Sequence, residues 1–188
     1  RHHVPVAAHA HATAGINQAI IAGARSIEHG TYLDDLSMDL MVEHGTYYVP
    51  TIYVGDYYAG TDKLLAQEKN DDVYLNYRDE WLRRIGKAHR QGVKIVVGVD
   101  LGGYAIAPHV YAREFATLVE AGLSPMQAIK AGTSVAAEML GWNDRVGTLK
   151  AGKLADIIAV PGNPLEDISV LERPQFVMLG GKVVRRSE

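Results

Sequence analysis

The sequence predicts an α/β fold, the second half of a (β/α)8 barrel followed by a small β-sandwich element. Strand and helix patterns alternate through the first two-thirds of the 188 residues, as they do where helices cover parallel strands. Four strand-helix units can be counted, whereas a complete barrel needs eight strands and about 250 residues. Beyond Gly141 only strand-like runs remain. We therefore expect half a barrel over residues 1–143 and part of a β-sandwich domain over residues 144–188.

The first two units follow from residue periodicity and helix-end signals. Strands are predicted for residues 4–8 and 26–29, which are short runs of mostly apolar character. The second helix opens at Asp34 and Asp35, which suit a helix N-terminus, and ends at Gly45. The first helix carries apolar residues at helical spacing: Ile16, Ala19, Ile20 and Ala24.

The third and fourth units are longer. A strand is predicted for residues 47–54, which are rich in aromatic and β-branched side chains. The helix after it runs over residues 63–91 and is interrupted near residues 70–72. The fourth strand covers residues 94–99, and a helix over residues 112–121 follows it.

The last part of the chain changes character. A helix begins at Ser124, where proline follows the capping serine, and runs to about residue 140. Strand-like runs then cover residues 154–160 and 176–185, and a glycine pair at 180–181 predicts a hairpin turn.

Composition excludes several functional classes. A hydrophobic fraction of 47% and a net charge of −3 are typical of a globular protein with a sizeable core, and nucleic acid is not an expected partner. No apolar run approaches the roughly 20 residues that cross a bilayer, so no membrane partner is expected. The absence of cysteine excludes disulfides but leaves the compartment open, cytoplasmic or exported. Because Arg1 is not an initiator methionine, we expect a fragment or a processed piece.

Three polar side chains follow apolar strand-like runs. His9, His29 and Asp100 each lie at the end of a predicted strand, and the carboxyl ends of barrel strands meet at the mouth where such folds place their chemistry. Two histidines and an aspartate suit a borderline ion such as zinc. The alternative interpretation is that both histidines are core residues and Asp100 caps a helix. Their repeated position favours the metal site.

These segments resemble the metal-dependent amidohydrolase superfamily, especially its imidazolonepropionase-like, prolidase and metallo-carboxypeptidase branch. The resemblance runs essentially from end to end. It rests on four segments: His9-Ala10-His11, Ser26-Ile27-Glu28-His29-Gly30, Gly98-Val99-Asp100, and the stretch from Gly147 to Asp156 (GTLKAGKLAD).

The resemblance implies that His9, His29 and Asp100 are metal ligands from barrel strands 5, 6 and 8. The remaining ligands would come from strands 1 to 4, so the missing N-terminal half is an expected partner. One or two divalent ions, taken as Zn²⁺, would activate water, and Asp100 would act as general acid and base.

Three further residues are candidates for substrate contact. His11 shares a strand face with His9, so either could ligate, and we assign His9 to the metal and His11 to substrate or a supporting role. Tyr53 and His109 resemble substrate-side positions. The alternative for Tyr53 is packing, and the alternative for His109 is a histidine at a helix N-terminus without a functional role. Val99 and the loop of residues 102–105 depart from the family pattern, which affects substrate specificity.

The function predicted from the sequence is metal-dependent hydrolysis of an amide or peptide bond in a dipeptide or an N-acyl amino acid. An imidazolonepropionase-like opening of a cyclic amide is the alternative within the class. From another class, the chain would be an inactive half-barrel or a binding module that needs a partner chain. Half a barrel exposes two sheet edges, which a partner half or a homo-oligomer would cover.

Overall fold

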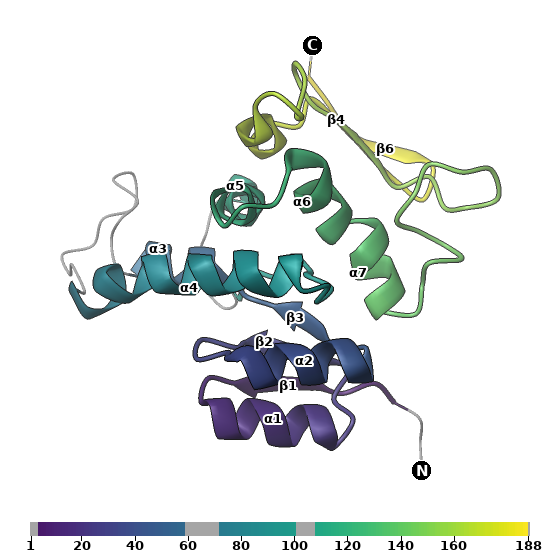
Figure 1. Ribbon diagram of the computed structural model, residues 1–188. Helices are drawn as coiled ribbons and strands as arrows, with labels where there is room; N and C mark the ends of the chain where they lie inside the picture. Colours follow the sequence, from purple (N-terminus) through teal and green to yellow (C-terminus); the bar gives the residue numbers. More distant parts are fainter. Residues whose placement is uncertain (1–3, 59–71, 101–107, 188) are drawn as a thin grey trace.

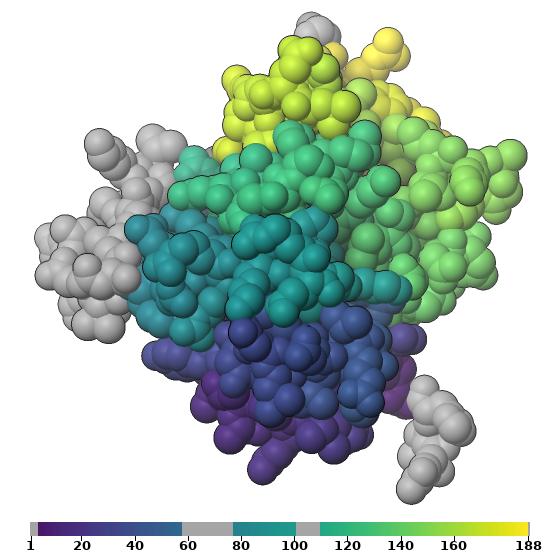
Figure 2. Space-filling view, in the orientation of Figure 1, coloured from purple at the N-terminus to yellow at the C-terminus, as the bar shows by residue number. Residues whose placement is uncertain are grey.

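The computed structural model describes residues 4–58, 72–100 and 108–187, and within these ranges it leaves out the side chains of residues 58, 72–76, 108 and 109. A parallel sheet with its helices holds the N-terminal end, and an antiparallel sheet lies at the other end beyond a group of helices (Figure 1). The chain is layered in sequence order between these two ends (Figure 2).

The parallel sheet comprises β1 (Ala7–Ala10), β2 (Ser26–His29) and β3 (Tyr47–Val49), in that spatial order. Its register pairs His9 with Glu28 and Ala10 with His29. The bounds predicted for the second strand are confirmed, whereas β1 begins three residues later than expected. The sheet therefore brings the ends of β1 and β2, with their histidines, side by side.

Two helices cover this sheet, α1 (Thr13–Ile21) and α2 (Asp35–His44), and they pack against each other. The Asp34 carboxylate accepts a hydrogen bond from the Ser37 backbone N–H at 2.8 Å, and Gly45 ends α2 with a left-handed φ of 67°. The start and the end predicted for this helix are both confirmed. The apolar faces of the helices are buried: Ile16, Ile20, Met38 and Met41.

The third predicted strand is wrong beyond residue 49. β3 stops at Val49, and residues Ile52–Tyr58 form the helix α3 instead. Thr51 turns the chain between them with a φ of 53°, and a carboxylate from a distant helix binds the first backbone N–H groups of α3. Local β propensity is overridden here by a tertiary contact.

The fourth predicted strand is reduced to one bridge, between Tyr48 and Ile95. The Val96 N–H donates to the Tyr48 carbonyl at 2.9 Å, and the next bond of a parallel ladder would need an N–H at Pro50, which has none. The segment still follows β3 closely, because a Cβ at Gly98 would collide with the Val49 side chain. The prediction of a regular strand over residues 94–99 is therefore wrong, although the segment does run beside β3.

The middle of the chain is helical. Its elements are α4 (Asp72–Arg90), the 3-10 helix η1 (Pro108–Ala112), α5 (Arg113–Glu120), α6 (Pro125–Ala131) and α7 (Ser134–Met139). Residues 63–71 of the predicted third helix lie outside the described residues. The helix predicted for 124–140 is two helices, since Ala131 gives its carbonyl to Val97.

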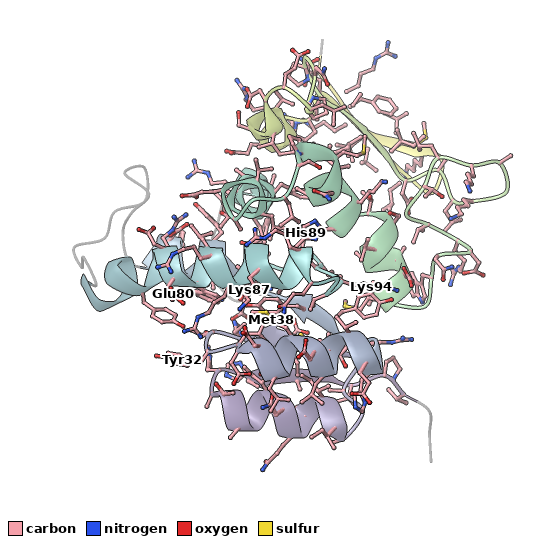
Figure 3. The ribbon with its side chains drawn as sticks, in the orientation of Figure 1. Tyr32, Met38, Glu80, Lys87, His89 and Lys94 are labelled. Atoms are coloured by element: carbon pink, nitrogen blue, oxygen red, sulfur yellow. The ribbon has the colours of Figure 1, made fainter. Side chains whose placement is uncertain are left out.

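Helix α4 runs alongside α2 (Figure 3). Met38 of α2 lies at their junction and is 1% exposed, while Lys87 of α4 forms an ion pair with Asp35 at 2.5 Å. The main core joins the two helices through Trp81, Leu82 and Ile85. This packing fixes α4 over the parallel sheet.

The C-terminal sheet is antiparallel, with β4 (Ile157–Ala159), β5 (Phe176–Leu179) and β6 (Lys182–Arg186) in that order. The predicted hairpin turn at residues 180–181 is confirmed. The short helix η2 (Ile168–Glu172) contacts α5, where Glu172 pairs with Arg113 at 3.2 Å.

Within the described ranges, none of the helices combines the length and the apolar character needed to cross a membrane.

Candidate metal centre

Three imidazoles converge at the carboxyl ends of β1 and β2. One ligand atom from each of His9, His11 and His29 lies within 4.8 Å of the other two. The ring centroids of His9 and His29 are 4.6 Å apart, and those of His11 and His29 are 4.8 Å apart with nearly parallel planes. His29 is buried, whereas His9 and His11 are exposed. The cluster therefore combines two solvent-exposed imidazoles with one buried imidazole.

Backbone conformation at the site is unusual. Among the described residues, three that are not glycine have a positive φ: His29 at 69°, Thr51 at 53° and Asp100 at 49°. Left-handed backbone is disfavoured for residues with a Cβ and persists where the surroundings enforce it, most often at functional sites. All three lie where the chain leaves the sheet or the segment beside it.

Two threonine hydroxyls fix the rings of the cluster. The Nδ1 atom of His29 lies 2.7 Å from the Thr51 hydroxyl oxygen, and the Nδ1 atom of His11 lies 2.7 Å from the Thr31 hydroxyl oxygen. In both rings the other nitrogen, Nε2, is then the one that can face an ion. A metal-bound histidine commonly donates a hydrogen bond from its second ring N–H to a neighbouring acceptor, and this contact orients the ring.

Asp100 lies next to the histidine cluster, on the segment beside β3. Its Oδ2 atom lies 3.8 Å from His29 Nε2, and its side chain is 61% exposed. This separation exceeds a hydrogen bond. Ligand bonds of about 2 Å would put two ligand atoms of a tetrahedral ion roughly 3.3 Å apart. The three imidazoles could therefore hold a metal ion, with the Asp100 carboxylate close by.

The electrostatics favour neutral imidazoles. Burial lowers the pKa of His29, the neighbouring rings of His11 and His9 lower it further, and Asp100 opposes them. Burial and then His9 lower the pKa of His11. A histidine binds a metal in its neutral form. The surroundings of His11 and His29 thus favour the neutral state that binding of a cation requires.

Glu28 lies on β2, directly before His29, and is paired in register with His9 of β1. Its carboxylate accepts a hydrogen bond from the Ser26 hydroxyl at 2.6 Å. Burial raises the pKa of Glu28, the bond from Ser26 opposes that rise, and the charge of Asp100 adds to it. The charge of Asp100 therefore reaches a second carboxyl group, that of Glu28.

The three residues predicted to contact substrate differ in how they lie relative to the histidine cluster. His11 joins the cluster. Tyr53 lies on α3, is 4% exposed and packs beside Val110, and its hydroxyl accepts a hydrogen bond from Arg113 at 3.2 Å. The backbone of His109 belongs to η1, but its side chain lies outside the described residues, as does the 102–105 loop. Substrate contact by Tyr53 and His109 stays a prediction.

Sequence reasoning missed the supporting residues. Thr31 and Thr51 carry no motif of their own, because a single threonine after a strand is common. Tyr48 was counted only as a strand residue, yet its hydroxyl donates to the backbone carbonyl of His29. Only the spatial pairing of these residues with the histidines reveals their role.

Comparison with known proteins agrees with this geometry. The chain is 35% identical to the ochratoxinase of Aspergillus niger over 186 residues, which is 96% of this chain and 38% of that protein. It is 30% identical to the imidazolonepropionase of Mesorhizobium japonicum over 159 residues, which is 82% of this chain and 34% of that protein. The chain thus spans less than half the length of these relatives.

A solved structure of a Xaa-Pro dipeptidase with bound methionine in its active site is similar in three dimensions. It superposes with a TM-score of 0.83 at 41% sequence identity, over 97% of this chain and 45% of that one. This coverage fits a partial barrel. The sequence profile of the amidohydrolase family matches residues 1–184. With its histidine cluster at the ends of parallel strands, the chain belongs to the amidohydrolase family.

Proposed function

We propose that the chain forms the metal-binding half of an enzyme that hydrolyses amide or peptide bonds. One observation carries the proposal: His9, His11 and His29 converge, with Asp100 Oδ2 3.8 Å from His29 Nε2. Membership of the amidohydrolase family supports the same chemistry. We assign His9, His29 and Asp100 to one or two divalent ions, with zinc as the expected metal.

The chain's own residues would perform the proton transfers. A divalent ion bound here would polarise the substrate carbonyl and make a coordinated water more acidic. Asp100, exposed and next to the imidazoles, would accept the proton of the attacking water and pass it to the leaving nitrogen. His29 would stay neutral throughout, since its surroundings lower its pKa.

The proposed substrates are dipeptides or N-acyl amino acids. The similarity to a dipeptidase structure at 41% identity supports a peptide-like substrate. The weaker match to an imidazolonepropionase keeps a cyclic amide as the second candidate.

Complete activity is proposed to need more than these residues. The chain corresponds to 38% of the ochratoxinase and 45% of the dipeptidase, and we propose that a partner half supplies the remaining ligands. The competing proposal is that the chain is a catalytically inactive half-barrel or a binding module that needs a partner chain.

Metal analysis tests the site directly. We expect elemental analysis of the purified chain after zinc loading and desalting to find bound zinc, and His9→Ala and His29→Ala to lose it. His44→Ala is the control, because His44 is an exposed residue at the end of α2. Equal zinc in all four proteins would overturn the site. With a complementing N-terminal half present, Asp100→Asn should keep the fold and abolish turnover of a dipeptide.

A further inference from the structure

A buried glutamate lies outside the cluster yet connects to it. Glu114, in the first turn of α5, is fully buried. Its Oε1 accepts a hydrogen bond from the Ile52 N–H at 3.1 Å, and its Oε2 accepts one from the Tyr53 N–H at 2.7 Å. These N–H groups open α3, where a helix leaves its first donors without partners inside the helix. Glu114 therefore caps α3 from another helix.

The cap adjoins the corner that Thr51 forms. Thr51 immediately precedes α3, is 3% exposed and has a φ of 53°. A β-branched residue does not adopt this conformation unless its surroundings hold it there. The two hydrogen bonds to Glu114 fix the next two residues, so they restrain the corner on its C-terminal side.

The corner in turn determines how His29 is held. The Thr51 hydroxyl lies 2.7 Å from His29 Nδ1, and His29 Nε2 faces Asp100 at 3.8 Å. When the hydroxyl accepts from Nδ1–H, the neutral ring keeps its lone pair on Nε2. A small rotation of Thr51 would remove that acceptor.

We propose that Glu114 is a positioning residue for the metal centre: by capping α3 it holds Thr51 in the left-handed corner that fixes the Nδ1–H tautomer of His29. The inference rests on the proposed function in taking Nε2 as the metal-binding atom. Its structural part concerns the tautomer alone and can be measured without metal.

A matched control lies on the same helix. Arg78 of α4 binds Asp56 of α3 with an Nε to Oδ1 distance of 2.5 Å, and it also binds Glu120 of α5 at 2.8 Å. Through Arg78, Glu120 thus helps to hold α3, α4 and α5 together. It does not contact the corner at Thr51. Glu120→Gln changes the same chemical group as Glu114→Gln and leaves the cap in place.

The first experiment is nitrogen-15 NMR of the His29 ring in the metal-free chain, near pH 7.5, where an imidazole of ordinary pKa about 6.5 is largely neutral. We expect Nδ1–H in the unmodified chain, in Thr51→Ser and in Glu120→Gln. Thr51→Val and Glu114→Gln should shift the ring toward Nε2–H. A folded Glu114→Gln chain with the unmodified tautomer would overturn the proposal. If Glu114→Gln does not fold, Glu114→Asp replaces it, because the shorter side chain draws the carboxylate back from α3. The His29 tautomer of that variant then decides the proposal in the same way.

The second experiment measures zinc affinity in a double-mutant cycle. Loss of a supporting contact typically weakens metal binding by 10 to 100-fold. We expect Glu114→Gln and Thr51→Val each to weaken it within that range, and the double variant to be no weaker than either single one, because both act through one contact. Effects that multiply would show that Glu114 acts by another route. A chain that binds no zinc at all contradicts the proposed function, while the tautomer result still decides the role of Glu114.

Discussion

The Tyr48 hydroxyl donates a hydrogen bond to the backbone carbonyl of His29 at 2.9 Å. The same oxygen accepts a hydrogen bond from the Trp81 indole N–H at 3.0 Å. Tyr48 is fully buried, and burial raises the pKa of its phenol, so the hydroxyl remains a donor. The backbone of a proposed metal ligand is thereby tied to α4 through one buried side chain.

Tyr48→Phe should destabilise the fold through these two contacts. The substitution leaves the Trp81 N–H and the His29 carbonyl without their partner, and each buried unsatisfied group costs about 1–3 kcal/mol. We expect the free energy of unfolding, measured by urea titration, to fall by about 2–4 kcal/mol. The exposed Tyr32, changed to phenylalanine, is the control and should leave stability unchanged. Equal stability of both variants would contradict a stabilising role of the two hydrogen bonds of the Tyr48 hydroxyl.

Gly30→Ala should be more damaging than Gly45→Ala. Both glycines have a positive φ, 54° and 67°, and an alanine there costs about 1–2 kcal/mol. At Gly30 the added Cβ would also lie 2.6 Å from the Tyr48 ring, whereas at Gly45 nothing lies within 4 Å. Thermal unfolding of the two variants should show a clearly lower Tm for Gly30→Ala. Equal Tm values would mean that the Tyr48 ring moves aside.

Stability should fall as pH rises, because of Glu114. Burial raises the pKa of Glu114 from 4.5 to about 8, with Asp56 adding to the rise and the N–H groups of Tyr53 and Ile52 and the charge of Arg78 opposing it. The unfolded chain loses this proton near pH 4.5 and the folded chain near pH 8. The contribution is therefore complete below pH 4.5 and is lost as pH rises through 8.

Glu114→Gln isolates that contribution. Between about pH 5 and 9, urea titrations should show the unmodified chain losing on the order of a few kcal/mol more stability than the variant. Parallel stability curves for the two chains would contradict the raised pKa of Glu114.

Zinc should stabilise the chain through the residues assigned to it. Zinc at about 100 times its Kd should add about 2.7 kcal/mol to the free energy of unfolding. Thr31→Val removes the hydroxyl that lies 2.7 Å from His11 Nδ1. Because His11 is assigned to substrate and not to the metal, we expect Thr31→Val to bind zinc as tightly as the unmodified chain, which calorimetric titration checks. A loss of zinc affinity of about 10 to 100-fold, the size typical of a lost contact behind a metal ligand, would make His11 a ligand instead.

The sequence was sufficient where the signal was local. β2 has the predicted bounds, Asp34 and Gly45 delimit α2 closely, and the hairpin at 180–181 forms as expected. The ends of the first strands also brought His9 and His29 together, because parallel strands end at one edge of a sheet.

The sequence was insufficient where distant groups decide. Residues 52–54 have strong β propensity, but Glu114, some sixty positions away, caps them as a helix. The ladder that residues 94–99 were expected to form ends opposite Pro50, which has no N–H to give to the next carbonyl. The supporting hydroxyls of Thr31 and Thr51 depend on the same kind of long-range pairing.

The left-handed conformation of His29, Thr51 and Asp100 has an evolutionary consequence. Glycine would relax the backbone at each of these positions, and asparagine would relax it in part. Selection for heat resistance alone would therefore favour the replacements that remove the imidazole, the hydroxyl and the carboxylate from the site. Directed evolution of this chain needs a simultaneous selection for metal binding, because the stabilising substitutions closest at hand would erase its chemistry.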